Sequence, residues 1–299
     1  MSARSPSVGD LAARFGVSPA RRRKDRIARG VIAAATVLAL IPLVLIIYYL
    51  LKKGLGAWSS SFFTTDPTGN TFFKNSTIGG VKSAILGSIE MVALASAIAI
   101  PLGVGVALWL VEYGKASWFA KVVRFFVDVL TGVPSIVFGL FIYIVLIIGT
   151  GSTFAGYKGS LALSLLMLPV VIRSAEVILM LVPAGLRESA LALGAPRWKV
   201  IFRIVLPTAL PGMVTGVLLA VARAAGETAP LLFTAGSPKG TTSDLGAFMN
   251  SLPVQIYNDI NSATPSVVTR AWGAALALVT LILVLNLIAR LISRRSRLA

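Results

Sequence analysis

The chain has 299 residues, of which 56% are hydrophobic and only 13% are charged, and its mean hydropathy is +0.86. Soluble domains carry about a quarter charged residues, so this balance excludes a single water-soluble core. The absence of cysteine and histidine excludes disulfides, cysteine–histidine zinc sites and serine–histidine catalysis. The net charge of +17 would suit a nucleic-acid-binding protein, but the basic residues flank apolar stretches instead of forming one face. We therefore predict an integral membrane protein without a nucleic-acid partner.

Six apolar stretches are each long enough to cross a bilayer, because about 20 helical residues match the roughly 30 Å hydrocarbon layer. They cover approximately residues 31–51, 83–111, 125–149, 159–183, 207–233 and 271–292. Short connections and the lack of strand-like alternation favour helices over a β-barrel. We therefore predict an all-α membrane protein with a six-transmembrane-helix bundle over residues 30–292.

The first apolar stretch follows a basic tail, residues 1–29, which resembles the start of a signal peptide. However, the apolar run from Val31 to Leu51 is longer than the core of a signal peptide, and no small-residue cleavage site precedes Lys52. An uncleaved first span is therefore the preferred interpretation, with a cleaved signal as the alternative.

The distribution of lysine and arginine predicts how the chain is oriented in the membrane. Most of them lie in the N-terminal tail, in the loops after spans 2 and 4, and in the C-terminal tail, residues 293–299. By the positive-inside rule both termini face the cytoplasm. The loops at 52–82 and 236–269 then lie on the outer side, and apolar residues such as Phe62 and Met249 predict that they cap the bundle or lie at the membrane interface.

The cytoplasmic loop over residues 184–206 is predicted to form two short helices. Gly194 can adopt the left-handed conformation that ends the first helix, and Pro196 suits the first turn of the second. The Leu206-Pro207 pair then begins the next span. From physical chemistry alone, this loop is equally well explained as an exposed docking element or as an amphipathic connector on the membrane surface.

The same loop resembles the coupling motif of permeases in bacterial ATP-binding-cassette importers. Six residues match that motif in type and spacing, and Ser189 replaces its usual first alanine; the matching residues are Glu188, Ala190, Gly194, Ile204, Leu206 and Pro207. The resemblance implies a type I importer permease with a coupling helix-turn-helix between spans 4 and 5. In that family this element docks on a separate ATPase subunit.

The chain lacks the phosphate-binding loop of an ATPase. The nearest segment, residues 114–116, has neither the leading glycine nor the hydroxyl residue of that motif. We therefore expect a non-catalytic subunit with no cofactor of its own, while ATP and magnesium bind the partner ATPase.

Two pairs of opposite charges fall near the centres of predicted spans, where charges are costly and functional by default. Arg173 and Glu176 are three residues apart in span 4, and Arg223 and Glu227 are four apart in span 5, so each pair shares one helical face. Each pair is either a self-neutralising salt bridge or part of a shared polar cavity. For Glu90 and Asp128, near span ends, snorkelling or capping is the preferred interpretation.

The arginines favour an anionic substrate, because a guanidinium stays protonated when buried and binds oxyanions side-on. The neighbouring glutamates would weaken this attraction enough to permit release. A carboxylate at Glu176 or Glu227 would also accept a hydrogen bond from monohydrogen phosphate, which sulfate cannot donate. We hypothesise that this contact selects phosphate over sulfate.

Three further segments resemble the PstA-type permeases of bacterial phosphate-specific importers, and the similarity covers roughly residues 30–290. They are residues 131–139, 173–176 and 223–233, with a fourth similar segment at 79–88. The resemblance implies a bacterial plasma-membrane protein that forms half of a phosphate pathway. Its partners would be two copies of an ATPase, a second paralogous permease and an extracytoplasmic phosphate-binding protein. The alternatives are import of sulfate, molybdate or phosphonate, a stand-alone secondary transporter, and a membrane-embedded phosphotransferase.

Overall fold

A computed structural model describes residues 19–67, 79–114 and 117–295, with side chains described for all of them except residues 19–22, 289 and 291–295. Within these ranges the regular elements are helical, apart from an isolated bridge between Pro67 and Gly79. Five helices are long and apolar enough to cross a membrane, and a bent helix pair makes a sixth candidate span. The predicted all-α membrane fold is therefore confirmed. Most of the predicted tail 1–29 and of the tail 293–299 lies outside the described residues.

The chain divides into two compact units, residues 1–51 and 52–299. In the first unit the described residues form helix α2, Pro19–Gly54, which extends beyond the predicted span at both ends. Basic residues begin the helix, and Lys52 and Lys53 lie in its last turn. Its length of 36 residues exceeds the bilayer core, so the basic ends reach the aqueous interfaces at 1.5 Å rise per residue.

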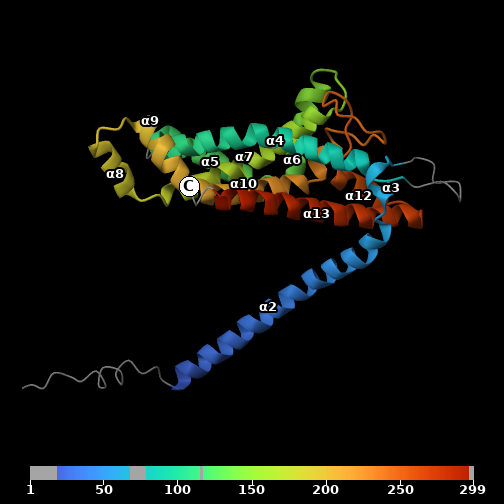
Figure 1. The fold of residues 1–299 in the computed structure, drawn as a ribbon, viewed down its shortest axis with the longest axis horizontal. Helices are drawn as coiled ribbons and strands as arrows, with labels where there is room; N and C mark the ends of the chain where they lie inside the picture. The colour runs from blue at the N-terminus through green and yellow to red at the C-terminus, as the bar shows by residue number, and fades with distance from the viewer. Residues whose placement is uncertain (1–18, 68–78, 115–116, 296–299) are drawn as a thin grey trace, which may run out of the picture. The chain divides into compact units, whose positions relative to one another are not determined.

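The second unit is a helical bundle in which α4, α5, α7, α10 and α13 lie side by side (Figure 1). Helices α8 and α9 lie at one end, here called the α8 end, and α3 and α12 lie at the other, the α12 end. The elements are η1 Leu55–Ala57, α3 Ser60–Thr64, α4 Lys82–Leu108, the π-helical turn η2 Trp109–Gly114, α5 Trp118–Gly132, α6 Ser135–Ile142, the π-helical turn η3 Tyr143–Ile148, α7 Gly156–Met180, α8 Ala184–Ala192, α9 Arg197–Val200, the π-helical turn η4 Ile201–Val205, α10 Leu206–Ala225, α11 Ala229–Leu232, α12 Leu252–Ile260 and α13 Pro265–Arg295.

Helix α7 is the most buried of the long helices and packs against both α4 and α10. Glycines allow the close approach: a Cβ on Gly103 of α4 would lie 2.7 Å from Val171, and one on Gly216 of α10 would lie 2.3 Å from Ser174. Small residues at such crossings permit the van der Waals packing that holds helices together in lipid. These contacts hold α7 between α4 and α10.

Gly87 provides a direct test of this packing. A Cβ there would lie 2.1 Å from the carbonyl oxygen of Asn250, whereas Gly105 on the same helix has no atom within 4 Å. We expect Gly87→Ala to destabilise the protein by about 1–3 kcal/mol through overpacking, and Gly105→Ala to leave its stability unchanged or slightly higher. Thermal unfolding in detergent measures both. Equal melting temperatures for the two variants would contradict this account of the α4 packing.

The third apolar stretch, predicted as one span over 125–149, is broken. Helices α5 and α6 meet at an angle of 103°. The break follows from Val133-Pro134, because the residue before a proline avoids the helical conformation, and Val133 has φ −72° and ψ 131°. The third predicted span is therefore present as a pair of helices bent at this proline.

The fifth stretch is also interrupted, since α10 ends at Ala225 and the short helix α11 begins at Ala229. The two interrupted segments contact each other, because α11 packs on α6. A Cβ on Gly139 of α6 would lie 2.6 Å from the Cα atom of Pro230. Both irregular segments thus support one another inside the protein, as irregular backbone in a membrane protein must.

The two long loops fold against the α12 end of the bundle. Phe62 is buried with Val81 and Ala274, and Met249 and Val254 are buried in the main core. Residues 68–78 of the first loop lie outside the described residues. The described parts of both loops therefore pack as elements of the fold.

Candidate functional site

Glu176 lies at the centre of a network of four charges between α5 and α7. Its side chain is only 2% exposed, and both oxygens accept hydrogen bonds from guanidiniums. Arg124 Nε donates to Oε1 at 2.6 Å, and Arg173 Nη1 donates to Oε2 at 2.9 Å. The predicted pairing of Arg173 with Glu176 is therefore present, but Arg124 shares the glutamate.

Arg173 also binds Asp128 of α5. Its Nε donates to Asp128 Oδ1 at 2.8 Å, and its Nη2 donates to the same oxygen. The interpretation of Asp128 as a capping or snorkelling residue was wrong. Sequence reasoning missed Asp128 and Arg124 because their partners are about 50 residues away, although their spacing of four on amphipathic α5 places them on one face.

The second predicted pair is weaker. Arg223 lies in the last turn of α10, and Glu227 follows the end of that helix. The Nε–Oε1 distance is 3.6 Å, which is an ion pair beyond hydrogen-bond length. Glu90, in contrast, accepts a hydrogen bond from Ser243 of the long loop at 2.8 Å, so the end-of-span role predicted for it is replaced by a contact within the protein.

The two pairs lie at different levels. Helices α7 and α10 are antiparallel, with Gly216 beside Ser174 and Gly212 beside Ile178. Counting from this register at 1.5 Å per residue, Arg223 is roughly 9 Å closer to the α12 end than Arg173. The backbone positions of the two pairs therefore lie at successive levels along the bundle.

Several of these charges are accessible in the isolated chain. Side-chain exposure is 56% for Asp128, 35% for Arg173 and 49% for Arg223. Charged groups within apolar spans face protein or a water-filled cavity, because lipid does not solvate them. The face that carries these residues is therefore suited to line an aqueous pathway.

The loop after α7 has the local structure that its sequence predicts. Gly194 has φ +79°, and its N–H and that of Ala195 donate to the carbonyls of Leu191 and Ala190, which ends α8. Pro196 directly precedes α9. However, α9 continues through η4 into α10 without a break, so Leu206 and Pro207 do not begin a separate helix.

Apolar side chains project from this loop, with Leu193 88% exposed and Trp198 and Phe202 each 60% exposed. On the other side Ala190, Ile201 and Val205 are buried. The remaining motif residues are partly or fully exposed, and they are Glu188, Ser189, Ile204, Leu206 and Pro207. An anchored element with exposed apolar residues is typical of a docking surface.

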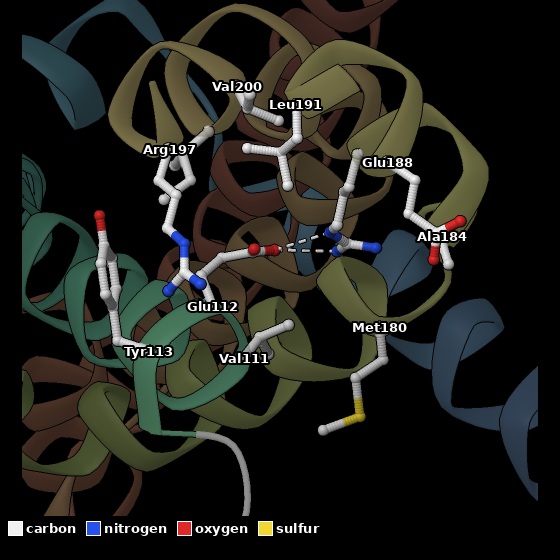
Figure 2. A pocket seen from close by; sticks show the side chains of 11 residues that line it. Val111, Glu112, Tyr113, Met180, Ala184, Glu188, Leu191, Arg197 and Val200 are labelled. Carbon is white, nitrogen blue, oxygen red and sulfur yellow. Dashed lines mark hydrogen bonds and ion pairs between the residues drawn. The ribbon is translucent and has the colours of Figure 1, made fainter. Parts of the chain in front are cut away.

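Figure 2 shows a pocket of about 400 Å³ beneath this loop, lined by Glu188 of α8 and Met180 of α7 among others. Arg187 donates to Glu112 of η2 at 3.0 Å and to the carbonyls of Leu179 and Val182 at 2.9 and 2.7 Å. One side chain on α8 therefore fastens the ends of both α4 and α7. Neither Arg187 nor Glu112 was predicted from the sequence as a functional residue.

A multi-pass helical bundle with accessible charges on α5, α7 and α10 and an exposed loop after α7 is typical of the permease class of membrane protein. Residues 99–298 match the family described as "Binding-protein-dependent transport system inner membrane component", and the chain belongs to this family. It is thus a multi-pass inner-membrane protein.

Two curated relatives carry a more specific name. The chain is 40% identical over 279 residues to the "Phosphate transport system permease protein PstA" of Yersinia pestis, covering 93% of this chain and 92% of that protein. It is 42% identical over 278 residues to the protein of the same name from Mycobacterium leprae, covering 91% and 89%. The fold also matches a chain of a bacterial ABC transporter for alginate import, with a TM-score of 0.60, 17% identity, and coverage of 91% and 96%. The predicted family and importer-permease fold are confirmed.

Proposed function

We propose that this chain forms half of a translocation pathway for inorganic phosphate, driven by ATP hydrolysis on a separate subunit. The observation that carries the proposal is the pair of accessible arginines, Arg173 and Arg223, in otherwise apolar helices. Guanidiniums replace part of the hydration shell that a phosphate loses on leaving water. The names of the close relatives support phosphate as the substrate.

The different heights of the two ion pairs along the bundle suggest that phosphate crosses the protein in steps. With the α12 end outside, as the basic residues predict, phosphate would contact Arg223 and Glu227 first and then Arg173 and Glu176. Both termini would then lie in the cytoplasm. Each arginine has an adjacent carboxylate that limits how tightly the anion is held, so passage to the next site does not require breaking a very strong complex.

The partners follow from the surfaces that the bundle leaves exposed. The loop with Leu193 and Trp198 would dock on the ATPase, present in two copies that bind ATP and magnesium, while this chain is non-catalytic. A second paralogous permease would cover the charged face and complete the cavity. An extracytoplasmic phosphate-binding protein would deliver substrate at the α12 end.

Transport by the reconstituted complex tests this function against its alternatives. We expect ATP-dependent phosphate uptake that excess sulfate, molybdate or phosphonate does not suppress, and no uptake when the ATPase subunit is omitted. Uptake without the ATPase would indicate a secondary transporter. Suppression by another oxyanion would reassign the substrate, and phosphoryl transfer to lipid would indicate a phosphotransferase.

For the selectivity hypothesis we propose Glu227 over Glu176, because both oxygens of Glu176 already accept hydrogen bonds from arginines. We expect Glu227→Gln to reduce the preference for phosphate over sulfate about tenfold, since the amide oxygen accepts a hydrogen bond from the phosphate hydroxyl more weakly than a carboxylate does, and the new amide N–H groups can also donate to sulfate. Competition between labelled phosphate and sulfate measures the preference. Asp25→Asn, which alters an exposed ion pair with Arg29 in α2, is the control. An unchanged preference in Glu227→Gln would remove glutamate-based selection from the mechanism.

A further inference from the structure

The guanidinium of Arg173 is already engaged by carboxylates in this structure. The edge formed by Nε and Nη2 is one that binds carboxylates and phosphates side-on. Both atoms donate to Asp128 Oδ1, and the remaining Nη1 donates to Glu176. An oxyanion that approaches Arg173 therefore meets an edge that Asp128 occupies.

The two carboxylates differ in how easily they can leave Arg173. Glu176 is buried and pairs with two guanidiniums, so its departure would break two ion pairs in a site with little water. Asp128 is more than half exposed, and water can solvate its carboxylate when the contact breaks. The replaceable ligand of Arg173 is therefore Asp128, while Glu176 and Arg124 form a fixed support.

We infer that Asp128 is a built-in competitor for the substrate, which holds Arg173 when the site is empty and is displaced when an oxyanion binds. The inference rests on the proposed function of Arg173. Monohydrogen phosphate displaces the carboxylate because it carries about twice the charge and presents several acceptor oxygens. When access to the site reverses, Asp128 takes Arg173 back and so accelerates release. Asp128 thus sets substrate affinity and release without itself binding the anion.

Binding of labelled phosphate to the purified transporter, assembled without its binding protein, tests this inference. We expect Asp128→Asn to lower the dissociation constant about three- to fivefold, the effect of removing a partly exposed ion pair, and to slow the maximal transport rate. Asp25→Asn serves as the matched control, because it also removes a carboxylate from an arginine pair. An unchanged or raised dissociation constant, or binding no better than that of Arg173→Ala, would overturn the inference.

A second variant separates charge from structure. The chain has no cysteine, so Asp128→Cys introduces a single thiol. In complexes whose other subunits are also free of cysteine, an anionic sulfonate reagent at this thiol should weaken phosphate binding again, and a neutral reagent should not. Equal effects of the two reagents would also overturn the inference. If these variants fail but the wild-type complex still transports phosphate, only the inference about Asp128 is refuted. If the wild-type complex does not transport phosphate, the proposed function is refuted.

Discussion

Replacing Arg173 with alanine is expected to reduce phosphate transport by the assembled complex by at least about 100-fold. The change removes a cation that pairs with both Glu176 and Asp128, and it leaves the buried carboxylate of Glu176 with one fewer guanidinium. Each charged hydrogen bond that Arg173 would make to the anion is worth about 1.5–3 kcal/mol, so losing two of them corresponds to a factor of roughly 100 or more. Initial rates of labelled phosphate uptake into proteoliposomes measure the effect.

Two further variants separate the charge of Arg173 from its geometry and control for the loss of an arginine elsewhere. Arg173→Lys keeps the charge but loses the side-on geometry, so we expect an intermediate rate. Arg29→Ala removes an exposed arginine that pairs with Asp25, and it should leave transport unchanged. Purification of the intact complex confirms that the variants assemble. Transport at the normal rate by Arg173→Ala would mean that the anion does not pass this arginine.

Much of the fold could be predicted because membrane insertion imposes a simple rule on sequence. A helix must stay apolar over about 20 residues, so the spans corresponding to α4 and α7 were placed to within a few residues. The coupling loop was equally predictable, since a left-handed glycine followed by a proline specifies its turn locally. Both the spans and this turn are determined by residues that are close together in the sequence.

Features that depend on tertiary contacts were not predictable in the same way. Hydropathy does not register the bend between α5 and α6, because both helices remain apolar, and its angle of 103° and the contact between α6 and α11 are tertiary features. The second partner of Glu176, Arg124, could not be chosen from sequence, because it lies 52 residues away in the chain. The different levels of Arg173 and Arg223 follow from the packing register of α7 and α10, which the glycine contacts fix.

Arg187 should couple the docking loop to the bundle, and its loss should separate ATP hydrolysis from transport. Arg187→Ala removes the hydrogen bonds to Glu112 and to two carbonyls at the end of α7. Movement of α8 would then no longer displace the ends of α4 and α7 together. We expect phosphate transport to fall at least about tenfold while ATP hydrolysis by the complex continues, since charged hydrogen bonds are each worth about 1.5–3 kcal/mol.

A double-mutant cycle distinguishes this link from a general loss of stability. Glu112→Ala removes one of the contacts, so its effect should be smaller than that of Arg187→Ala. If the two residues act as a unit, the double variant should be no worse than Arg187→Ala alone, because the shared contact is lost only once. Transport and ATP hydrolysis are measured together on purified complexes of each variant. Independent, additive losses, or a parallel fall of ATP hydrolysis and transport in Arg187→Ala, would show that this ion pair does not transmit the motion of the docking loop.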